Sequence, residues 1–581
     1  MTPYRSRREE RPKSAPDTGL VADMVRQFAD PYAFLRELIQ NGIDAGASRL
    51  DVRVELQPGN VVSTRVDDDG AGMSQEILEG PLLTLFSSSK EGGLDTIGRY
   101  GVGFISVFAL GPDEVQVETW REGVCWLLRL FRDHRYEIEE APPRAGRGTT
   151  VTLLQTLDRE GFAAHAARCE AALLRWCRHA ERPIRLFVAD LEAGTRAEPV
   201  RIDRAISVFA PIFVTRVLER KGLGKETFVV GVSAGSDHLE VPEGPAAPSA
   251  IERAPSFAGF YNRGLTLLES SEPLAPALAG VRFKVVSPCL QHTLSRDDVR
   301  RDADFERVLA TVEELVSSSL CGALMEELGE AARAAARGER VQSYAALLKA
   351  AIFRPTALAS NEITFPLASP LRGAPALRDL RRRARKGEPL LVATRADAIT
   401  EALAAAGRAV VLDHHAQIGA ALRRCYPGAS IEEACDTHLL VREIDPASLG
   451  EADLALGAAL LAVIRGAGEG LSRVGFCSIE GALAGRAAVV IPDGPPASPR
   501  LCAAREIEPW WNRWGSNDRL LLNVAAELTS AARSRAARAP LLVAHLLGRA
   551  LLGEDRRAIG EGPSDRLLEL AGLSLDGEAR G

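Results

Sequence analysis

Three polar side chains lie at helical spacing in the segment ELIQNGIDAGA, residues 37–47. On an α-helix, Glu37, Asn41 and Asp44 would project within about 60° of one another, beside the apolar face. Amide and carboxylate oxygens suit a hard cation such as Mg²⁺, and a carboxylate near that ion can orient or deprotonate a water. Taken alone, the same row could be the solvated edge of a helix.

A triple carboxylate followed by two glycines forms the next segment, VDDDGAGM. Gly70 and Gly72 permit positive φ angles and a close approach of the backbone to a ligand. A carboxylate at the end of a strand can accept a hydrogen bond from an exocyclic amine. A plain turn is the alternative interpretation of these residues.

Two further segments carry weaker signals. In IGRYGVGFISVFAL, Gly98, Gly101 and Gly103 precede an apolar helical pattern, so free backbone N–H groups and a helix dipole would face a phosphate. The GxxxxGK[ST] pattern of a P-loop is absent. In GRGTTVTLL, Thr149 and Thr150 lie on a predicted strand, where threonine is usually only a strand former.

The surrounding elements must position these residues. Asp30 and Pro31 predict the start of a helix that ends near Gly46. The segment RLDVRVEL alternates with period two and predicts a half-buried strand. Further strands are predicted at VVSTRV, DEVQVETW, VCWLLRLF, YEIEEA and GTTVTLLQ. One helix followed by many short strands predicts an α/β sandwich with a mixed, largely antiparallel sheet.

In the rest of the chain, the sequence pattern predicts a linker at residues 194–203, followed by a second α/β unit. That unit has strands at FVVGV and VRFKVV and a long helical stretch from Phe305 to Arg337. A strand, a helix, a glycine stop and a second strand follow in KGEPLLVATRADAITEALAAAGRAVVLD. After about residue 440 the pattern is mostly helical, with one β segment at GRAAVVIPDG.

Composition limits the function classes. The 581 residues carry a net charge of -7, which argues against a dedicated nucleic-acid binder. The basic run Arg378–Lys386 is either a nucleic-acid patch or, as we prefer, a solvated helix end. Nine cysteines without a CxxC fit reduced thiols in the cytoplasm. We expect no signal peptide and no membrane span.

In this order and spacing the four segments resemble the ATP-binding motifs of the GHKL superfamily. Its Bergerat fold is shared by gyrase-type topoisomerases, MutL proteins, sensor histidine kinases and the ninety-kilodalton heat-shock chaperones. FLRELIQNGIDA resembles the N box, DDDGAGM and IGRYGVGF the two glycine boxes, and GRGTTVTL the closing strand. The sequences of these motifs are most similar to those of the heat-shock chaperones. The segment CRHAERPIRLFVADLE is also similar to the one that leaves their ATPase domain.

The resemblance implies roles for individual residues. Glu37 would be the general base that orients the attacking water, and Asn41 would hold Mg²⁺. Asp68 would receive the adenine amino group, helped by Thr149 through water. Contacts to ATP are also implied for Asp44, Gly72, Met73, Lys90, Gly98, Gly101, Val102, Gly103 and Phe104.

GVRFKVVSPCLQHTLSRDDV is similar to the family's middle-domain segment with a catalytic loop, and Arg296 matches the arginine that reaches the γ-phosphate. An arginine from another domain would couple hydrolysis to domain closure. A surface arginine beside Asp297 and Asp298 is the alternative. The chain departs from the family at Arg300, where a polar amide is typical, and in a short lid before Gly98.

The resemblance implies an ATP-dependent chaperone that uses ATP and Mg²⁺ and forms a homodimer around client proteins in the cytoplasm. It implies a Bergerat-fold ATPase domain at 15–195, an α/β middle domain at 200–435, and a mostly helical C-terminal domain at 440–575. The last contains Trp510, Trp511 and Trp514, and its apolar helices could form either a buried core or a dimer seam. The alternative function is a GHKL switch in a nucleic-acid, signalling or defence assembly.

Overall fold

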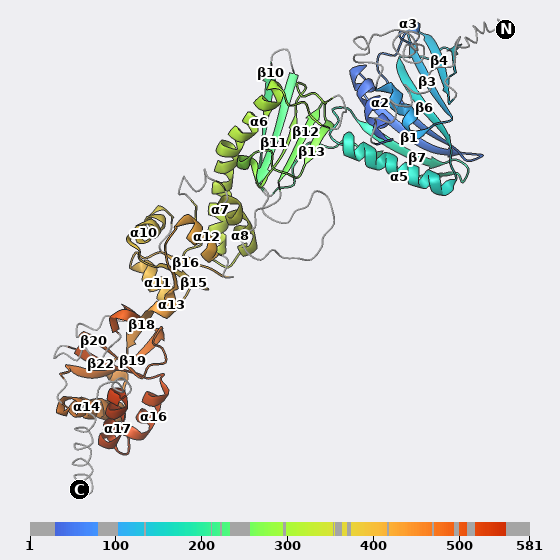
Figure 1. Ribbon diagram of the computed structural model, residues 1–581. Coiled ribbons are helices and arrows are strands. Elements are labelled where there is room, and N and C mark those ends of the chain that lie inside the picture. The colour runs from blue at the N-terminus through green and yellow to red at the C-terminus, as the bar shows by residue number, and fades with distance from the viewer. Residues whose placement is uncertain are drawn as a thin grey trace. The chain divides into compact units, whose positions relative to one another are not determined.

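The computed structural model describes residues 30–78, 103–132, 135–210, 212–220, 224–232, 256–293, 298–352, 354, 363–368, 373–414, 418–467, 470–492, 499–507 and 518–553. The chain divides into two compact units. Unit 1 comprises residues 1–244 and 253–323, and unit 2 comprises residues 245–252 and 324–581. Figure 1 shows the order of their helices and strands along the chain. The division into three domains stays a prediction.

A nine-stranded sheet dominates the first part of unit 1, in the order β5-β4-β3-β6-β2-β1-β7-β8, with β9 also paired to β7. The β1–β7 pair is parallel, whereas β1–β2, β2–β6, β3–β6, β3–β4 and β4–β5 are antiparallel. The prediction of a mixed, largely antiparallel sheet is therefore confirmed. The first seven strands are β1 (Leu50–Gln57), β2 (Val61–Asp68), β3 (Glu114–Arg121), β4 (Val124–Phe131), β5 (Tyr136–Ala141), β6 (Gly148–Thr156) and β7 (Ile184–Asp190).

The segment predicted to be a linker belongs to this sheet. It forms β8 (Thr195–Arg196) and β9 (Val200–Arg201), which both pair with β7. The N–H of Ile202 donates to the carbonyl of Ile184 over 3.0 Å, and the Ile202 side chain is fully buried. The linker prediction is wrong because polar composition does not reveal strand pairing at the edge of a sheet.

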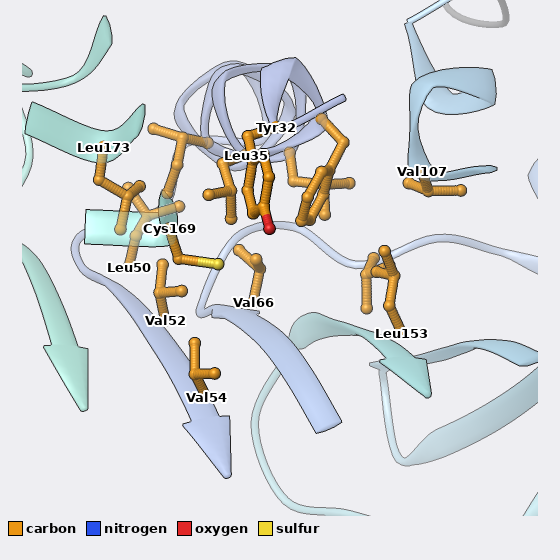
Figure 2. Packing of buried hydrophobic residues seen from close by; sticks show 14 of the residues in the cluster. Tyr32, Leu35, Leu50, Val52, Val54, Val66, Val107, Leu153, Cys169 and Leu173 are labelled. Atoms are coloured by element: carbon orange, nitrogen blue, oxygen red, sulfur yellow. The ribbon is translucent and has the colours of Figure 1, made fainter. Parts of the chain in front are cut away.

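Two helices pack on each other and on this sheet: α2 (Ala33–Asp44) and α5 (Arg159–Trp176). Figure 2 shows the apolar layer, in which Leu35 of α2 and Leu173 of α5 lie over the strand residues Leu50 and Val52. The helix α2 begins later than predicted, at Ala33, and Asp30 accepts a hydrogen bond from the N–H of Tyr32. Such end shifts of a few residues are common, because helix termini fray.

The second part of unit 1 is a five-stranded sheet in the order β10-β11-β14-β12-β13. The helix α6 (Ala303–Leu315) packs on it through Phe305, which contacts Phe260. A π-helical turn, η5 (Val316–Leu320), leads into α7 (Cys321–Ala335), so the long helical stretch is confirmed. The strands are β10 (Ile212–Arg220), β11 (Gly224–Val232), β12 (Phe257–Asn262), β13 (Leu265–Ser270) and β14 (Val281–Val286), with η4 (Pro276–Leu278) before β14.

The helical run Ala303–Ala335 is long and apolar enough to cross a membrane on length and composition alone. Core helices of soluble proteins pass the same test. Here Phe305, Val308 and Val312 are buried within the protein.

Unit 2 begins with a small parallel sheet, β16-β15-β17. Its β15 (Leu390–Ala393), α11 (Ala398–Ala405) and β16 (Val410–Leu412) form the predicted strand, helix and strand, and Gly407 takes a φ of 77° at the helix stop. The basic run lies at the end of α10 (Gly373–Lys386). The other elements here are α8 (Val341–Ile352), α12 (Ile418–Cys425), β17 (Ile431–Glu433) and α13 (Ala434–Thr437).

After residue 440 the prediction of a single β segment is wrong. A five-stranded sheet in the order β20-β22-β19-β18-β21 lies beside the helices. Its strands are β18 (His438–Glu443), β19 (Arg473–Gly481), β20 (Ala488–Pro492), β21 (Arg500–Ala503) and β22 (Asp518–Asn523). The helical elements are η6 (Pro446–Ser448), α14 (Glu451–Gly466), α15 (Ala504–Ile507), α16 (Glu527–Ala536) and α17 (Pro540–Gly553). The predicted β segment at GRAAVVIPDG is β20, and the Trp510, Trp511 and Trp514 cluster lies outside the described residues.

Candidate functional site

The helix α2 carries the predicted row of polar side chains. Glu37 is buried, with 6% of its surface exposed, and its Oε1 lies 3.5 Å from Nη2 of Arg36. Asn41, one helical turn later, is exposed. A Cβ on Gly42 would lie 2.5 Å from the Leu50 side chain and 3.2 Å from Cβ of Asp68. The glycine therefore lets the polar edge of α2 come close to the end of β2.

Asp44 has partners of its own. Its carboxylate accepts from Nη1 of Arg263 over 2.7 Å and from Nε2 of Gln40 over 3.1 Å. Arg263 lies in the turn between β12 and β13, so this contact ties α2 to the five-stranded sheet. Because both side chains are more than 40% exposed, the ion pair adds little stability.

The three carboxylates at the end of β2 have different surroundings. Asp67 accepts from Oγ1 of Thr150 over 2.7 Å and from Nε of Arg65 over 2.7 Å. Asp69 accepts from the backbone N–H and the hydroxyl of Ser48. Burial opposes ionisation of Asp69, but these hydrogen bonds outweigh it and lower its pKa. Both outer carboxylates therefore hold local structure.

Asp68 differs from its neighbours. Its Oδ1 accepts from the N–H of Gly70 over 2.8 Å, and it pairs in register with Thr149 on β6. Burial raises the pKa of Asp68 from 3.8 to about 6, and the nearby charge of Asp69 acts in the same direction. A partly buried carboxylate with a perturbed pKa is a candidate for ligand recognition.

The two glycines after Asp68 allow close backbone packing. Gly72 has a φ of 68°, and a Cβ there would lie 2.5 Å from the carbonyl oxygen of Trp120. A Cβ on Gly70 would lie 2.7 Å from Cβ of Ala45. Any side chain at either position would push the turn away from the sheet, so both glycines are needed to keep it beside Asp68.

Thr119 on β3 was not predicted as part of the site. Its Oγ1 accepts from the N–H of Met73 over 2.7 Å and lies 3.2 Å from Oγ1 of Thr149. It thereby fixes the turn after Gly72 to strands β3 and β6. The sequence signal was weak, because Thr119 is one polar residue in an ordinary alternating strand.

The second glycine segment is only partly described. Gly103 immediately precedes η3 (Phe104–Leu110), which is a 3-10 helix. The hydroxyl of Ser106 donates to the carbonyl oxygen of Gly103 over 2.6 Å. Phe104 is buried and belongs to the core beneath α2. Lys90, Gly98, Gly101 and Val102 lie outside the described residues.

Arg296 also lies outside the described residues, but its flanks do not. His292 and Val299 form an antiparallel bridge, and the N–H of Thr293 donates to the carbonyl of Asp298. Backbone pairing on both sides of Arg296 therefore closes the base of the loop.

The polar residues of α2 are suited to a Mg²⁺ ion that is coordinated by only one or two protein side chains. Within the described part of the chain, no group of three or more His, Cys, Asp or Glu side chains is arranged for a metal ion. Mg²⁺ usually takes one or two protein oxygens and completes its coordination with water and phosphate. The exposed amide of Asn41, next to the turn that carries Glu37, is such a donor.

Comparisons with known proteins agree with this geometry. Residues 32–145 match the family model described as "Histidine kinase-, DNA gyrase B-, and HSP90-like ATPase". The Chaperone protein HtpG of Anaplasma phagocytophilum is 25% identical over 336 residues, covering 50% of this chain and 52% of that protein. HtpG of Chlorobaculum tepidum is 30% identical over 193 residues, covering 27% and 30%.

The mismatch repair endonuclease PMS2 of Gallus gallus is 32% identical over 127 residues, covering 21% of this chain and 14% of that protein. The chain thus matches about half the length of the first of these relatives and less of the others. The matched segment contains α2, β2 and β3, which carry Glu37, Asp68 and Thr119. Residues 32–145 therefore belong to an ATPase domain of the histidine kinase-, DNA gyrase B- and HSP90-like type, whose sheet continues into β6 beyond the matched segment.

Proposed function

We propose that unit 1 binds ATP with the adenine at the end of β2 and hydrolyses it beside α2. The observation that carries the proposal is the partly buried Asp68 carboxylate, in register with Thr149 and beside the Gly72 turn. A carboxylate with an amide N–H already on one oxygen can still accept from an exocyclic amine. The family match over residues 32–145 supports the same assignment.

Hydrolysis requires a water aligned with the γ-phosphate and positive charge on the transferring oxygens. We assign Glu37 to the water, since its carboxylate is largely withdrawn from solvent and lies one turn from Asn41. Mg²⁺ held by Asn41 would neutralise phosphate charge. We assign Arg296 to the γ-phosphate because its segment resembles the family's catalytic loop. Lys90 and the glycines at 98, 101 and 103 would complete the phosphate contacts.

The whole protein is proposed to be an ATP-dependent chaperone that closes as a homodimer around client proteins. The match to the Anaplasma HtpG supports this. That alignment spans 336 residues and is therefore much longer than the ATPase domain alone. The alternative, a GHKL switch in a nucleic-acid, signalling or defence assembly, is favoured by the PMS2 match, which spans 127 residues. We propose a cytosolic location because all nine cysteines are free.

Two parallel assays separate these functions. Aggregation of a denatured model enzyme is followed by light scattering with and without ATP, and DNA binding is measured at physiological salt. We expect ATP to change the suppression of aggregation by the parent protein but not by an Asp68→Asn variant. DNA binding without any effect on aggregation would reject the chaperone proposal in favour of the alternative.

A further inference from the structure

The turn between β12 and β13 contacts two parts of the proposed ATPase machinery. It consists of Arg263 and Gly264, and Asn262 is the strand residue before it. The side chain of Arg263 reaches the end of α2, and the side chain of Asn262 reaches the start of the loop that contains Arg296. The helix α2 and this loop are far apart in the sequence, so the turn is a direct connection between them.

The turn is anchored to the chain that follows α5. The N–H of Glu181 donates to the carbonyl oxygen of Arg263 over 3.1 Å. Gly264 has a φ of 80°, and a Cβ at this position would overlap the carbonyl oxygen of His179. Backbone contacts therefore fix both residues of the turn against the ATPase domain.

Arg263 has an unusual backbone conformation. Its φ is 48°, in the left-handed region that side chains other than those of Asn and Asp rarely adopt. With Gly264 also at positive φ, the turn is of the two-residue kind in which Asn-Gly is preferred. The turn itself therefore does not favour an arginine. Stability does not favour it either, because both partners of the ion pair with Asp44 are more than 40% exposed.

The side chain of Arg263 supplies a positive charge to the end of α2. Its Nη1 lies 2.7 Å from Oδ1 of Asp44, the last residue of the helix. The helix dipole is negative at this end, so a carboxylate is unfavourable there without a cation nearby. All residues of α2 are described, and its last turn contains no basic residue of its own. Arg263 therefore holds the end of the helix that carries Glu37 and Asn41.

Asn262 holds the other part of the machinery. Its Nδ2 donates to the carbonyl oxygen of Leu290 over 2.7 Å. The next residue, Gln291, accepts from the N–H of Arg300 over 2.7 Å, and this pairing begins the closed base of the loop. The two neighbouring side chains of the turn thus hold the base of the Arg296 loop and the end of α2.

We propose that Arg263 is a positioning residue for ATP hydrolysis, which keeps the end of α2 at a fixed distance from the base of the Arg296 loop. This inference rests on the proposed function, in which Glu37 and Arg296 meet at the γ-phosphate. Displacement of reacting groups by about 1 Å can slow a reaction by orders of magnitude. The adenine is assigned to the end of β2, in the other sheet, so loss of Arg263 should slow hydrolysis without weakening ATP binding.

The kcat of hydrolysis and the Kd for ATP, measured on the full chain, test the proposal. Arg263→Asn removes the cation but suits the turn, so we expect kcat to fall about tenfold while Kd stays within about twofold. Arg263→Lys keeps the positive charge and should recover part of the lost kcat. Arg216→Gln is the matched control, because Arg216 of β10 is 41% exposed and pairs with Glu314 over 3.0 Å. It should leave kcat unchanged.

Hydrogen exchange of β12 and β13 shows whether the hairpin is intact, and it should be no faster in Arg263→Asn than in the parent. A kcat of Arg263→Asn equal to that of the parent, or an equal fall in Arg216→Gln, would overturn the inference. A weaker Kd with unchanged kcat would also overturn it. Each of these results requires a parent protein that hydrolyses ATP. A parent without hydrolysis, or a Glu37→Ala variant as active as the parent, would instead reject the proposed function and this inference with it.

Discussion

The Asp68→Asn substitution should stabilise the protein while it abolishes the proposed nucleotide binding. Burial raises the pKa of Asp68 from 3.8 to about 6, so the folded state disfavours the charged carboxylate. Each pKa unit corresponds to about 1.4 kcal/mol, so above pH 7 the ionised group costs about 3 kcal/mol. An asparagine keeps an oxygen for the Gly70 N–H and carries no charge.

The stability gained by Asp68→Asn should depend on pH. The raised pKa means that the folded state binds more protons than the unfolded state between about pH 4 and 6, so stability conferred by the parent residue falls as pH rises through that window. The advantage of Asp68→Asn should therefore be about 1.5 kcal/mol at pH 5 and about 3 kcal/mol at pH 8. The Asp68 carboxylate also accepts from the backbone N–H of Thr149, and loss of this acceptor would subtract up to about 1 kcal/mol at both pH values.

Hydrogen-exchange mass spectrometry of β2 and β6 gives the local free energy of opening in the intact chain. Burial lowers the pKa of His165 to about 4, but this contribution cancels because parent and variant share it. Asp69→Asn is the matched control, and it should destabilise the turn because hydrogen bonds lower the pKa of Asp69. An Asp68→Asn variant no more stable than the parent at pH 8, or a gain equal at both pH values, would refute the reasoning.

Three further substitutions test separate parts of the structure. Gly72→Ala should destabilise the turn by more than about 1 kcal/mol and weaken ATP binding. The control Gly146→Ala is also at positive φ, but it has open space around it and should leave ATP binding intact. Calorimetry with ATP distinguishes the two variants. Thr119→Val should cost about 1–3 kcal/mol by leaving the Met73 N–H without its acceptor, measured as faster exchange of that amide. Glu443→Gln should lower the free energy of unfolding of β22 by about 3 kcal/mol, because it removes the negative charge 2.6 Å from the buried Arg519. Hydrogen exchange of β22 at increasing denaturant concentration measures this loss. Unchanged exchange in β22 would contradict a stabilising role for the Glu443–Arg519 ion pair.

The ATPase domain was the more predictable part of the chain because its strands have one buried face. In β1, Leu50, Val52, Val54 and Leu56 alternate with residues on the other face, as predicted from period two. In β22 the three consecutive residues Leu520, Leu521 and Leu522 are all buried, since β22 lies between two separate hydrophobic clusters. A run buried on both faces has no period, so periodicity cannot distinguish a strand from a buried helix there.

Within the site, sequence could identify the residue types but not their partners. Asp67, Asp68 and Asp69 are chemically identical in the sequence, and Thr150 and Ser48, both distant along the chain, hold the outer two. The contribution of Thr119 depends in the same way on cross-strand register, which its own strand does not encode. Tertiary contacts therefore decide which carboxylate remains available to a ligand.

The central claim is that the buried carboxylate of Glu37 orients the water that attacks ATP. Single-turnover hydrolysis and equilibrium binding of ATP should be measured together on the parent protein and on Glu37→Ala. We predict that the variant binds ATP with affinity close to that of the parent and that its hydrolysis falls at least a hundredfold, as for loss of a general base. Hydrolysis by Glu37→Ala at the parent rate would contradict the claim.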